Sequence, residues 1–167
     1  MALQNLNMRP TVDVDVLGQW DSTLMELIQL TDFPEKVKTC IRRVVESHPE
    51  LSGFKTNWVN LGPKQLAAIG LPKGFAQRLT PIKFGKTLTL RLLDRVDLLP
   101  LKLYAASDEF SPRQEIHFQD LKALNPTFDE LDEAINWMRS LEDFEEKRTE
   151  LRTVLGRLDH EDLAYYV

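Results

Sequence analysis

Residues 9–16 have the alternation of a half-buried β-strand that carries two carboxylates on one face. Val12, Val14 and Val16 alternate with Asp13 and Asp15, and successive side chains of a strand point to opposite faces. The valines can therefore enter a core, while the aspartates lie side by side, roughly 6–7 Å apart. Aspartate is depleted in strands. A divalent cation bound to phosphate oxygens would explain the pair, because hard cations take carboxylate ligands.

Size and composition fit a globular protein. A chain of 167 residues that is 43% hydrophobic can form one domain, or one domain with a helical appendage. Cys40 is the only cysteine, so a disulfide within the chain and a cysteine-based zinc site are excluded. No apolar run is long enough for a membrane span, and the first residues do not form a secretory signal. We therefore expect a cytoplasmic protein with no membrane partner.

The charge is unevenly distributed along the chain. Between Lys36 and Lys102 there are 13 Lys/Arg and 4 Asp/Glu, whereas residues 128–167 hold 5 Lys/Arg and 12 Asp/Glu. This division suggests that one part faces phosphates and the other is a solvated or partner-facing surface. Two ordinary solvated faces would give the same counts, so both interpretations stay open.

The first half of the chain has the pattern of a mixed α/β region. Leu24, Leu27 and Ile28 have helical spacing and predict a helix over residues 20–30. A second helix is expected from Asp32 to His48, with Cys40 on its apolar face. Strands are expected over residues 54–61 and, as a β-hairpin across Gly85-Lys86, over residues 81–84 and 87–93.

The second half has the pattern of a helical region. Asp97 is a candidate N-cap of a helix with Pro100 in its first turn, and residues 112–124 and 144–158 predict two further helices. Thr127 and Glu130 have the spacing of a capping box that opens another helix. We therefore predict an α/β core over residues 1–95 and a helical region over residues 96–167.

Three segments in a fixed order carry a family resemblance. Arg9 to Asp15 reads Arg-x-Thr-x-Asp-Val-Asp, residues 95–106 place Lys102 in a Lys-Leu-x-Ala setting, and residues 117–121 contain Asp120-Leu121. In these segments, which cover residues 6–124, the chain resembles the nucleotidyltransferase superfamily. It is most similar to the bacterial branch that includes the toxins of abortive-infection toxin–antitoxin systems. The resemblance implies an α/β (α+β) fold, with a small mixed sheet of nucleotidyltransferase type, flanking helices and a helical C-terminal half.

The resemblance also implies roles for individual residues. Asp13 and Asp15 would bind Mg²⁺ on a nucleoside triphosphate, which is oriented for in-line transfer of its nucleotidyl group. Lys102 would contact the phosphates, and Asp120 would position Lys102 or the acceptor group. Arg9 would contact phosphate and Thr11 would hold the start of the strand. The implied partners are the nucleotide and either RNA or a cognate antitoxin protein.

Two departures from the family keep other functions open. The glycine turn that cradles the triphosphate in the family has no counterpart before Asp13, and the expected strand 54–61 offers Asn57 and Asn60 in place of a third carboxylate. The chain is therefore an active enzyme, a truncated one, or a catalytically degenerate scaffold that acts as a binding or regulatory protein. A third alternative is a homodimer-forming domain whose aspartates have no role in binding.

Overall fold

The structure is a computed structural model that describes residues 13–48 and 57–167. The described residues divide into two compact units, which we call the N-terminal unit (up to Leu71) and the helical unit (Pro72–Val167). Short strands and many helices make up the described residues, so the mixed α+β class predicted from the sequence is confirmed. The division into domains at residues 95 and 96 stays a prediction. The compact units place the β5–β6 hairpin described below with the helices.

In the N-terminal unit, β1 (Val14–Asp15) pairs in parallel with β4 (Val59–Asn60). Among the described residues the strands of the whole chain form three separate two-stranded sheets rather than one mixed sheet. Residues 57 and 58 precede β4 as a turn, while residues 54–56 of the expected strand lie outside the described residues. Val14, expected in a core, is 43% exposed, so this part of the strand prediction is wrong.

The helix predicted over residues 20–30 is also wrong, because the segment forms an antiparallel pair, β2 (Gln19–Asp21) and β3 (Glu26–Ile28). The turn explains the difference. The Asp21 carboxylate accepts hydrogen bonds from the backbone N–H groups of Thr23 and Leu24, at 2.7 and 3.0 Å. Met25 takes a positive φ of 57°. An aspartate that bonds the backbone two and three residues ahead stabilises a turn in place of a helix.

Helix α1 (Glu35–Ser47) follows Pro34 and matches the predicted second helix closely. Asp32 forms an ion pair with Lys38, with 2.5 Å between Nζ and Oδ2. The side chain of Cys40 is exposed, so its expected place in the core is wrong. No residue of α1 is fully buried. The N-terminal unit continues with the 3₁₀ helix η3 (Gly62–Gln65) and α2 (Leu66–Ile69).

The predicted β-hairpin is confirmed in the helical unit. After α3 (Phe75–Arg78), β5 (Thr80–Phe84) pairs with β6 (Leu88–Leu92). The connecting turn has Gly85 at a φ of 61°, a left-handed conformation that glycine adopts without steric cost. Thr87, expected in the second strand, belongs to this turn.

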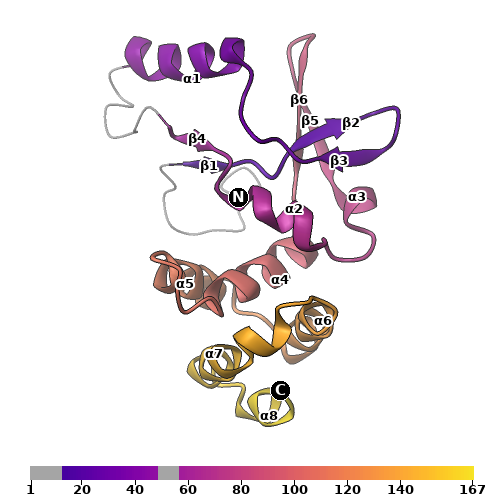
Figure 1. The fold of residues 1–167 in the computed structure, drawn as a ribbon, viewed down its shortest axis with the longest axis vertical. Helices are drawn as coiled ribbons and strands as arrows, with labels where there is room; N and C mark the ends of the chain where they lie inside the picture. Colours follow the sequence, from indigo (N-terminus) through magenta and orange to yellow (C-terminus); the bar gives the residue numbers. More distant parts are fainter. Residues whose placement is uncertain (1–12, 49–56) are drawn as a thin grey trace. The chain divides into compact units, whose positions relative to one another are not determined.

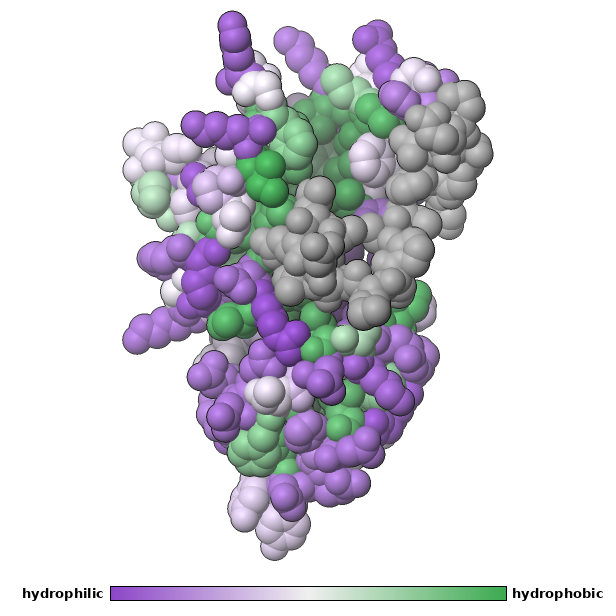
Figure 2. Space-filling model, turned by 180° about the vertical axis from the view of Figure 1, so that it is seen from behind, coloured by the Kyte–Doolittle hydropathy of each residue, from purple (hydrophilic) through white to green (hydrophobic). Residues whose placement is uncertain are grey.

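Five helices form the rest of the helical unit (Figure 1): α4 (Arg95–Ala106), α5 (Gln114–Leu124), α6 (Phe128–Met138), α7 (Phe144–Arg157) and α8 (Glu161–Tyr166). Their buried faces meet in one core, which includes Leu103, Leu121, Leu131, Ile135 and Leu151. The face of this region that is seen in Figure 2 is mostly hydrophilic, with hydrophobic patches between the hydrophilic side chains. None of the helices in the described ranges has the length and apolar character that crossing a membrane requires.

The ends of these helices test the sequence signals. The Thr127–Glu130 capping box is present in both directions, because each side chain accepts a hydrogen bond from the other residue's backbone N–H. By contrast, α4 begins at Arg95 with Asp94 as its N-cap, three residues before the predicted N-cap Asp97. The fully buried Asp97 binds Arg78 through two hydrogen bonds, from Nε at 3.0 Å and from Nη2 at 2.5 Å. Asp97 is therefore a core ion-pair partner and not a cap.

Candidate functional site

Lys102 and Asp120, which are distant in sequence, form an ion pair inside the helical unit. Lys102 lies on α4 and Asp120 on α5, and 2.7 Å separates Nζ from Oδ2. The Asp120 side chain is only 1% exposed and that of Lys102 is 15% exposed. A carboxylate this deeply buried requires a charged partner. In this geometry Asp120 can fix the position of the Lys102 ammonium group.

His117 completes a small cluster around the lysine. It lies one helical turn before Asp120, and its Nδ1 is 3.4 Å from the Lys102 Nζ. Lysine is only a donor, so this contact requires an unprotonated Nδ1 on His117. His117 and Asp120 thus share a helix face, as their spacing predicts. We call Lys102, His117 and Asp120 the lysine cluster.

In the N-terminal unit, strand β1 holds one of the two predicted metal ligands and directly follows the other. Asp15 is in β1 and exposed, and Asp13, half-buried, precedes the strand. Val14 N–H donates to the Trp58 carbonyl at 2.6 Å and Val16 N–H to the Asn60 carbonyl at 2.9 Å. These bonds set the parallel register in which Asp15 lies beside Asn60.

Oxygen atoms from both strands converge at Gly62. A Cβ atom placed on Gly62 would lie 2.7 Å from Asn60 Oδ1 and 3.7 Å from Asp15 Oδ1. The Gly62 N–H donates to Asn60 Oδ1 at 2.7 Å, so the amide oxygen is fixed in orientation. A side chain at position 62 would collide with this oxygen, and glycine leaves the space next to it open. We call Asp13, Asp15 and Asn60 the strand-edge oxygens.

The strand-edge oxygens have the chemistry of a hard-cation site. Two carboxylates and one amide oxygen are ligands that Mg²⁺ accepts, and Mg²⁺ completes its octahedral shell with water and phosphate oxygens. Within residues 13–48 and 57–167 there is no group of three or more His, Cys, Asp or Glu residues placed to hold a metal. A metal on β1 would therefore depend on the amide, on water and on the ligand's own phosphates.

The remaining residues named from the sequence have other positions. Arg9 and Thr11, expected to bind phosphate and to hold the strand, lie outside the described residues. Asn57 lines a hollow of about 360 Å³ beside α1, together with Phe33, Ile41 and Val59. The indole N–H of Trp58 donates to the Ile41 carbonyl at 3.2 Å, so this tryptophan ties β4 to α1.

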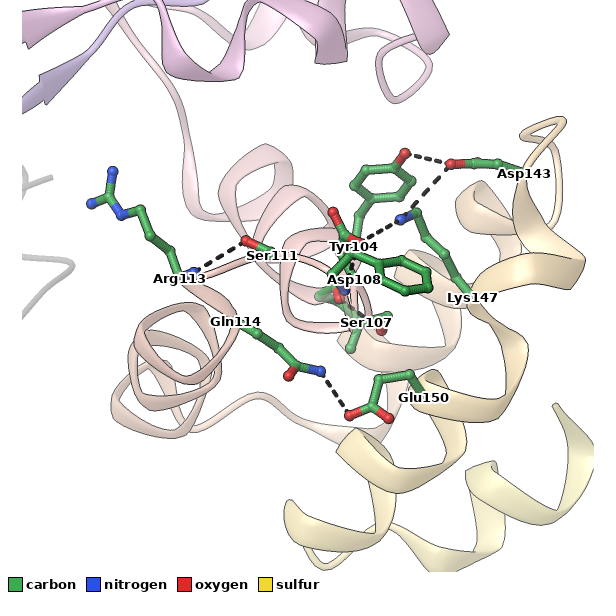
Figure 3. A network of polar contacts seen from close by, with 11 residues as sticks. Tyr104, Ser107, Asp108, Ser111, Arg113, Gln114, Asp143, Lys147 and Glu150 are labelled. Carbon is green, nitrogen blue, oxygen red and sulfur yellow. Dashed lines mark hydrogen bonds and ion pairs between the residues drawn. The ribbon is translucent and has the colours of Figure 1, made fainter.

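A polar network that was not predicted from the sequence ties α7 to α4 (Figure 3). The Tyr104 hydroxyl donates to Asp143 Oδ2 at 2.5 Å, and the Lys147 ammonium lies 4.4 Å from the centroid of the Tyr104 ring. Burial and the Asp143 carboxylate both raise the pKa of Tyr104, so its hydroxyl stays protonated as a donor. The i,i+4 spacing of Asp143 and Lys147 is a local signal, but no local pattern points to Tyr104.

A second ion pair fixes the start of α4 against α6. Arg95 donates from Nε to Glu130 Oε1 at 2.6 Å and from Nη2 to Oε2 at 2.9 Å. These hydrogen bonds from Arg95 are the main cause that lowers the pKa of Glu130 to about 2, and the capping bond from Thr127 adds to it. Helix α4, which carries Lys102, is therefore held before the lysine by the Arg95–Glu130 and Arg78–Asp97 ion pairs. Beyond the lysine it is held by the hydrogen bond from Tyr104 to Asp143.

Comparison of the chain with protein-family models, with curated proteins and with solved structures gives no match.

Proposed function

We propose that this chain is a nucleotidyltransferase-like protein in which Asp13 and Asp15 hold Mg²⁺ on a nucleoside triphosphate. One observation carries the proposal: the Asp15 carboxylate and the Asn60 amide oxygen both lie close to Gly62, and Asp13 precedes Asp15 by two residues. Carboxylates are uncommon in strands, and this set of hard oxygen donors suits a magnesium–triphosphate complex.

The proposal gives the other residues distinct tasks. When bound, Mg²⁺ would neutralise phosphate charge and orient the α-phosphate. An acceptor hydroxyl attacks that phosphorus, the bond to the oxygen bridging to the β-phosphate breaks, pyrophosphate leaves and the hydroxyl proton passes to solvent. Within the helical unit, Asp120, paired with Lys102 at 2.7 Å, holds the lysine ammonium group, a compact positive charge of the kind that suits phosphate oxygens. We propose RNA, a protein or a small molecule as the acceptor, and RNA or a cognate antitoxin protein as a partner.

Calorimetric titration of the full chain with a non-hydrolysable nucleoside triphosphate tests the metal site. With Mg²⁺ present we expect binding, and with EDTA a loss of at least tenfold in affinity. Asp15→Asn should weaken the Mg²⁺-dependent binding by a similar factor, because a neutral amide replaces one anionic ligand. Glu26→Gln is the matched control, since it removes one exposed carboxylate from β3 of the same unit. Equal binding by Asp15→Asn and the wild type would sink the proposal.

A second function is favoured by the chemistry of Asn60. Its amide oxygen already accepts the Gly62 N–H, and an amide cannot serve as a base. A chain with this site can bind a nucleotide without turning it over, as a regulatory protein on a nucleotidyltransferase-type scaffold. Pyrophosphate release in the presence of a candidate acceptor separates the two functions. Binding with no release supports the regulatory protein, and release that is lost in Asp15→Asn supports the enzyme.

A further inference from the structure

The chain contains a long stretch without acidic residues. From Leu51 to Leu93 there are seven Lys/Arg and no Asp/Glu, although the whole chain has 26 acidic residues and a net charge of −5. The β5–β6 hairpin lies inside this stretch and contributes Lys83, Lys86 and Arg91. Positive charge is therefore concentrated locally in a protein that is acidic overall.

The strand register divides the hairpin into two chemically different faces. Pro81 pairs with Arg91 and Lys83 with Thr89, and these side chains share one face. The opposite face carries the apolar pairs Ile82–Leu90 and Phe84–Leu88. This arrangement gives a ribbon with one polar, basic face and one apolar face.

The end of the ribbon is accessible. Lys83, Lys86 and Thr89 are exposed, and neither lysine forms an ion pair with another residue of the described ranges. The neighbouring Phe84 and Leu88 are 45% and 52% exposed. Lys86 stands in the turn itself, beside Gly85.

Dimensions and charge fit the ribbon to one kind of partner. Two strands lie about 5 Å apart, and five residues extend about 17 Å, while the major groove of B-DNA is about 12 Å wide and admits a two-stranded ribbon. Lysines supply phosphate contacts, threonine hydroxyls supply hydrogen bonds, and apolar side chains contact thymine methyl groups. The polar face of the hairpin offers the first two kinds of group near its tip, through Lys83 and Thr89, and Lys86 adds a second lysine in the turn.

We infer that the β5–β6 hairpin is a duplex-DNA-binding ribbon, which enters the major groove and contacts phosphates through Lys83 and Lys86. The inference is independent of the nucleotide site on β1, because it uses none of the strand-edge oxygens. It also gives a role to the exposed basic face of the hairpin. An isolated two-stranded sheet is only marginally stable in water.

Fluorescence anisotropy with a labelled duplex of about 20 base pairs tests this inference on the full chain. We expect the double variant Lys83→Gln/Lys86→Gln to bind at least tenfold more weakly at 50 mM salt. Its plot of log affinity against log salt should be shallower by about 2, because two phosphate contacts are lost. The matched control is Lys36→Gln/Lys122→Gln, which removes the same charge from two exposed lysines on α1 and α5. This control should change affinity by less than about twofold.

Three results would overturn the inference. The first is no binding of the duplex by the wild type at low salt, and the second is equal weakening in both double variants. The third is that duplex RNA competes with the labelled DNA as well as unlabelled duplex DNA does, because the major groove of duplex RNA is too deep and narrow for protein side chains to read. Sedimentation of the same samples identifies the alternative occupant: a dimer that binds no DNA would mean that a second copy covers the hairpin. Thermal melting of each variant confirms that both remain folded.

Discussion

The two units of this protein differ in how they bury their residues. Every fully buried residue in the described parts of the chain lies between Pro72 and Val167. In the N-terminal unit the described residues are half-buried or exposed, including all of α1. The lysine cluster therefore stands on a packed helical core, whereas the strand-edge oxygens stand on two short paired strands. Weakly packed regions open locally at low free energy, and binding sites are often drawn from them.

Truncating a core side chain should produce the largest difference between the units. Leu103 is 0% exposed in the core of the helical unit, so Leu103→Ala should lower the free energy of unfolding by about 2–5 kcal/mol. Ile41 is half-buried on α1, so Ile41→Ala should lower the free energy of unfolding by less than about 1.5 kcal/mol. Urea unfolding monitored by circular dichroism measures both. Equal losses would show that the N-terminal unit is packed as well as the helical one.

Two ion pairs sharpen the same comparison. Asp120→Ala leaves the Lys102 ammonium without its carboxylate in a buried position, and we expect a loss of about 3 kcal/mol. Asp32→Ala breaks the exposed pair with Lys38 in the N-terminal unit and should leave the urea midpoint almost unchanged. The double variant Lys102→Met/Asp120→Leu is the control, because it removes both charges and should recover much of the loss. No recovery would mean that the pair itself is not the source of the effect.

Acid should act on the helical unit through Glu130. Its pKa is about 2 in the folded protein, below the ordinary value of 4.5, because Arg95 bonds the ionised form. A lowered folded-state pKa contributes stability above pH 4.5 that is lost as the pH falls toward 2. We expect this contribution to be about 1–2 kcal/mol, since both side chains are partly exposed to solvent. Urea midpoints at pH 6 and pH 3 for the wild type and Glu130→Gln measure it. The variant should lose less stability than the wild type on acidification, and an identical loss would contradict the assignment.

The acidic segment of residues 128–167 contributes side chains to the core of the helical unit. Leu131, Ile135, Leu151 and Leu155 are buried at 0–1% exposure, although residues 128–167 are rich in acid. Deleting this segment would remove core side chains along with any binding surface. Substitutions of its exposed acidic residues are therefore the suitable way to look for a partner protein.

The contrast between the units also explains what the sequence could predict. The capping box at Thr127 and the turn at Gly85 are local signals, and both are confirmed. The 20–30 helix failed because three apolar residues at helical spacing are a weak pattern, and the Asp21 turn outweighs it. Cys40 was misplaced because α1 is amphipathic but has no core to cover its apolar face fully.

In the candidate site, too, the sequence indicates single residues but not the contacts that tertiary packing creates between them. The family resemblance pointed to Lys102 and Asp120, and the structure brings both together with His117 because α4 and α5 share one hydrophobic core. The sequence shows Asn60 as an amide on the next expected strand, but its register beside Asp15 is set by backbone pairing between residues 45 positions apart. The Tyr104–Asp143 bond and the Arg78–Asp97 pair depend on tertiary packing, so no local pattern predicts them.

Hydrogen exchange of the full chain, with and without Mg²⁺ and a non-hydrolysable nucleoside triphosphate, tests the central claim most directly. The account predicts that the two ligands together slow exchange at the backbone N–H groups of Val14 and Val16, which bond β4. Mg²⁺ alone should not slow them, and the Asp15→Asn variant should show no protection. Amides in the core of α4 and α7 should change little, because they are already protected. Unchanged exchange in β1 with both ligands present would contradict the assignment of Asp13 and Asp15 as the metal–nucleotide site.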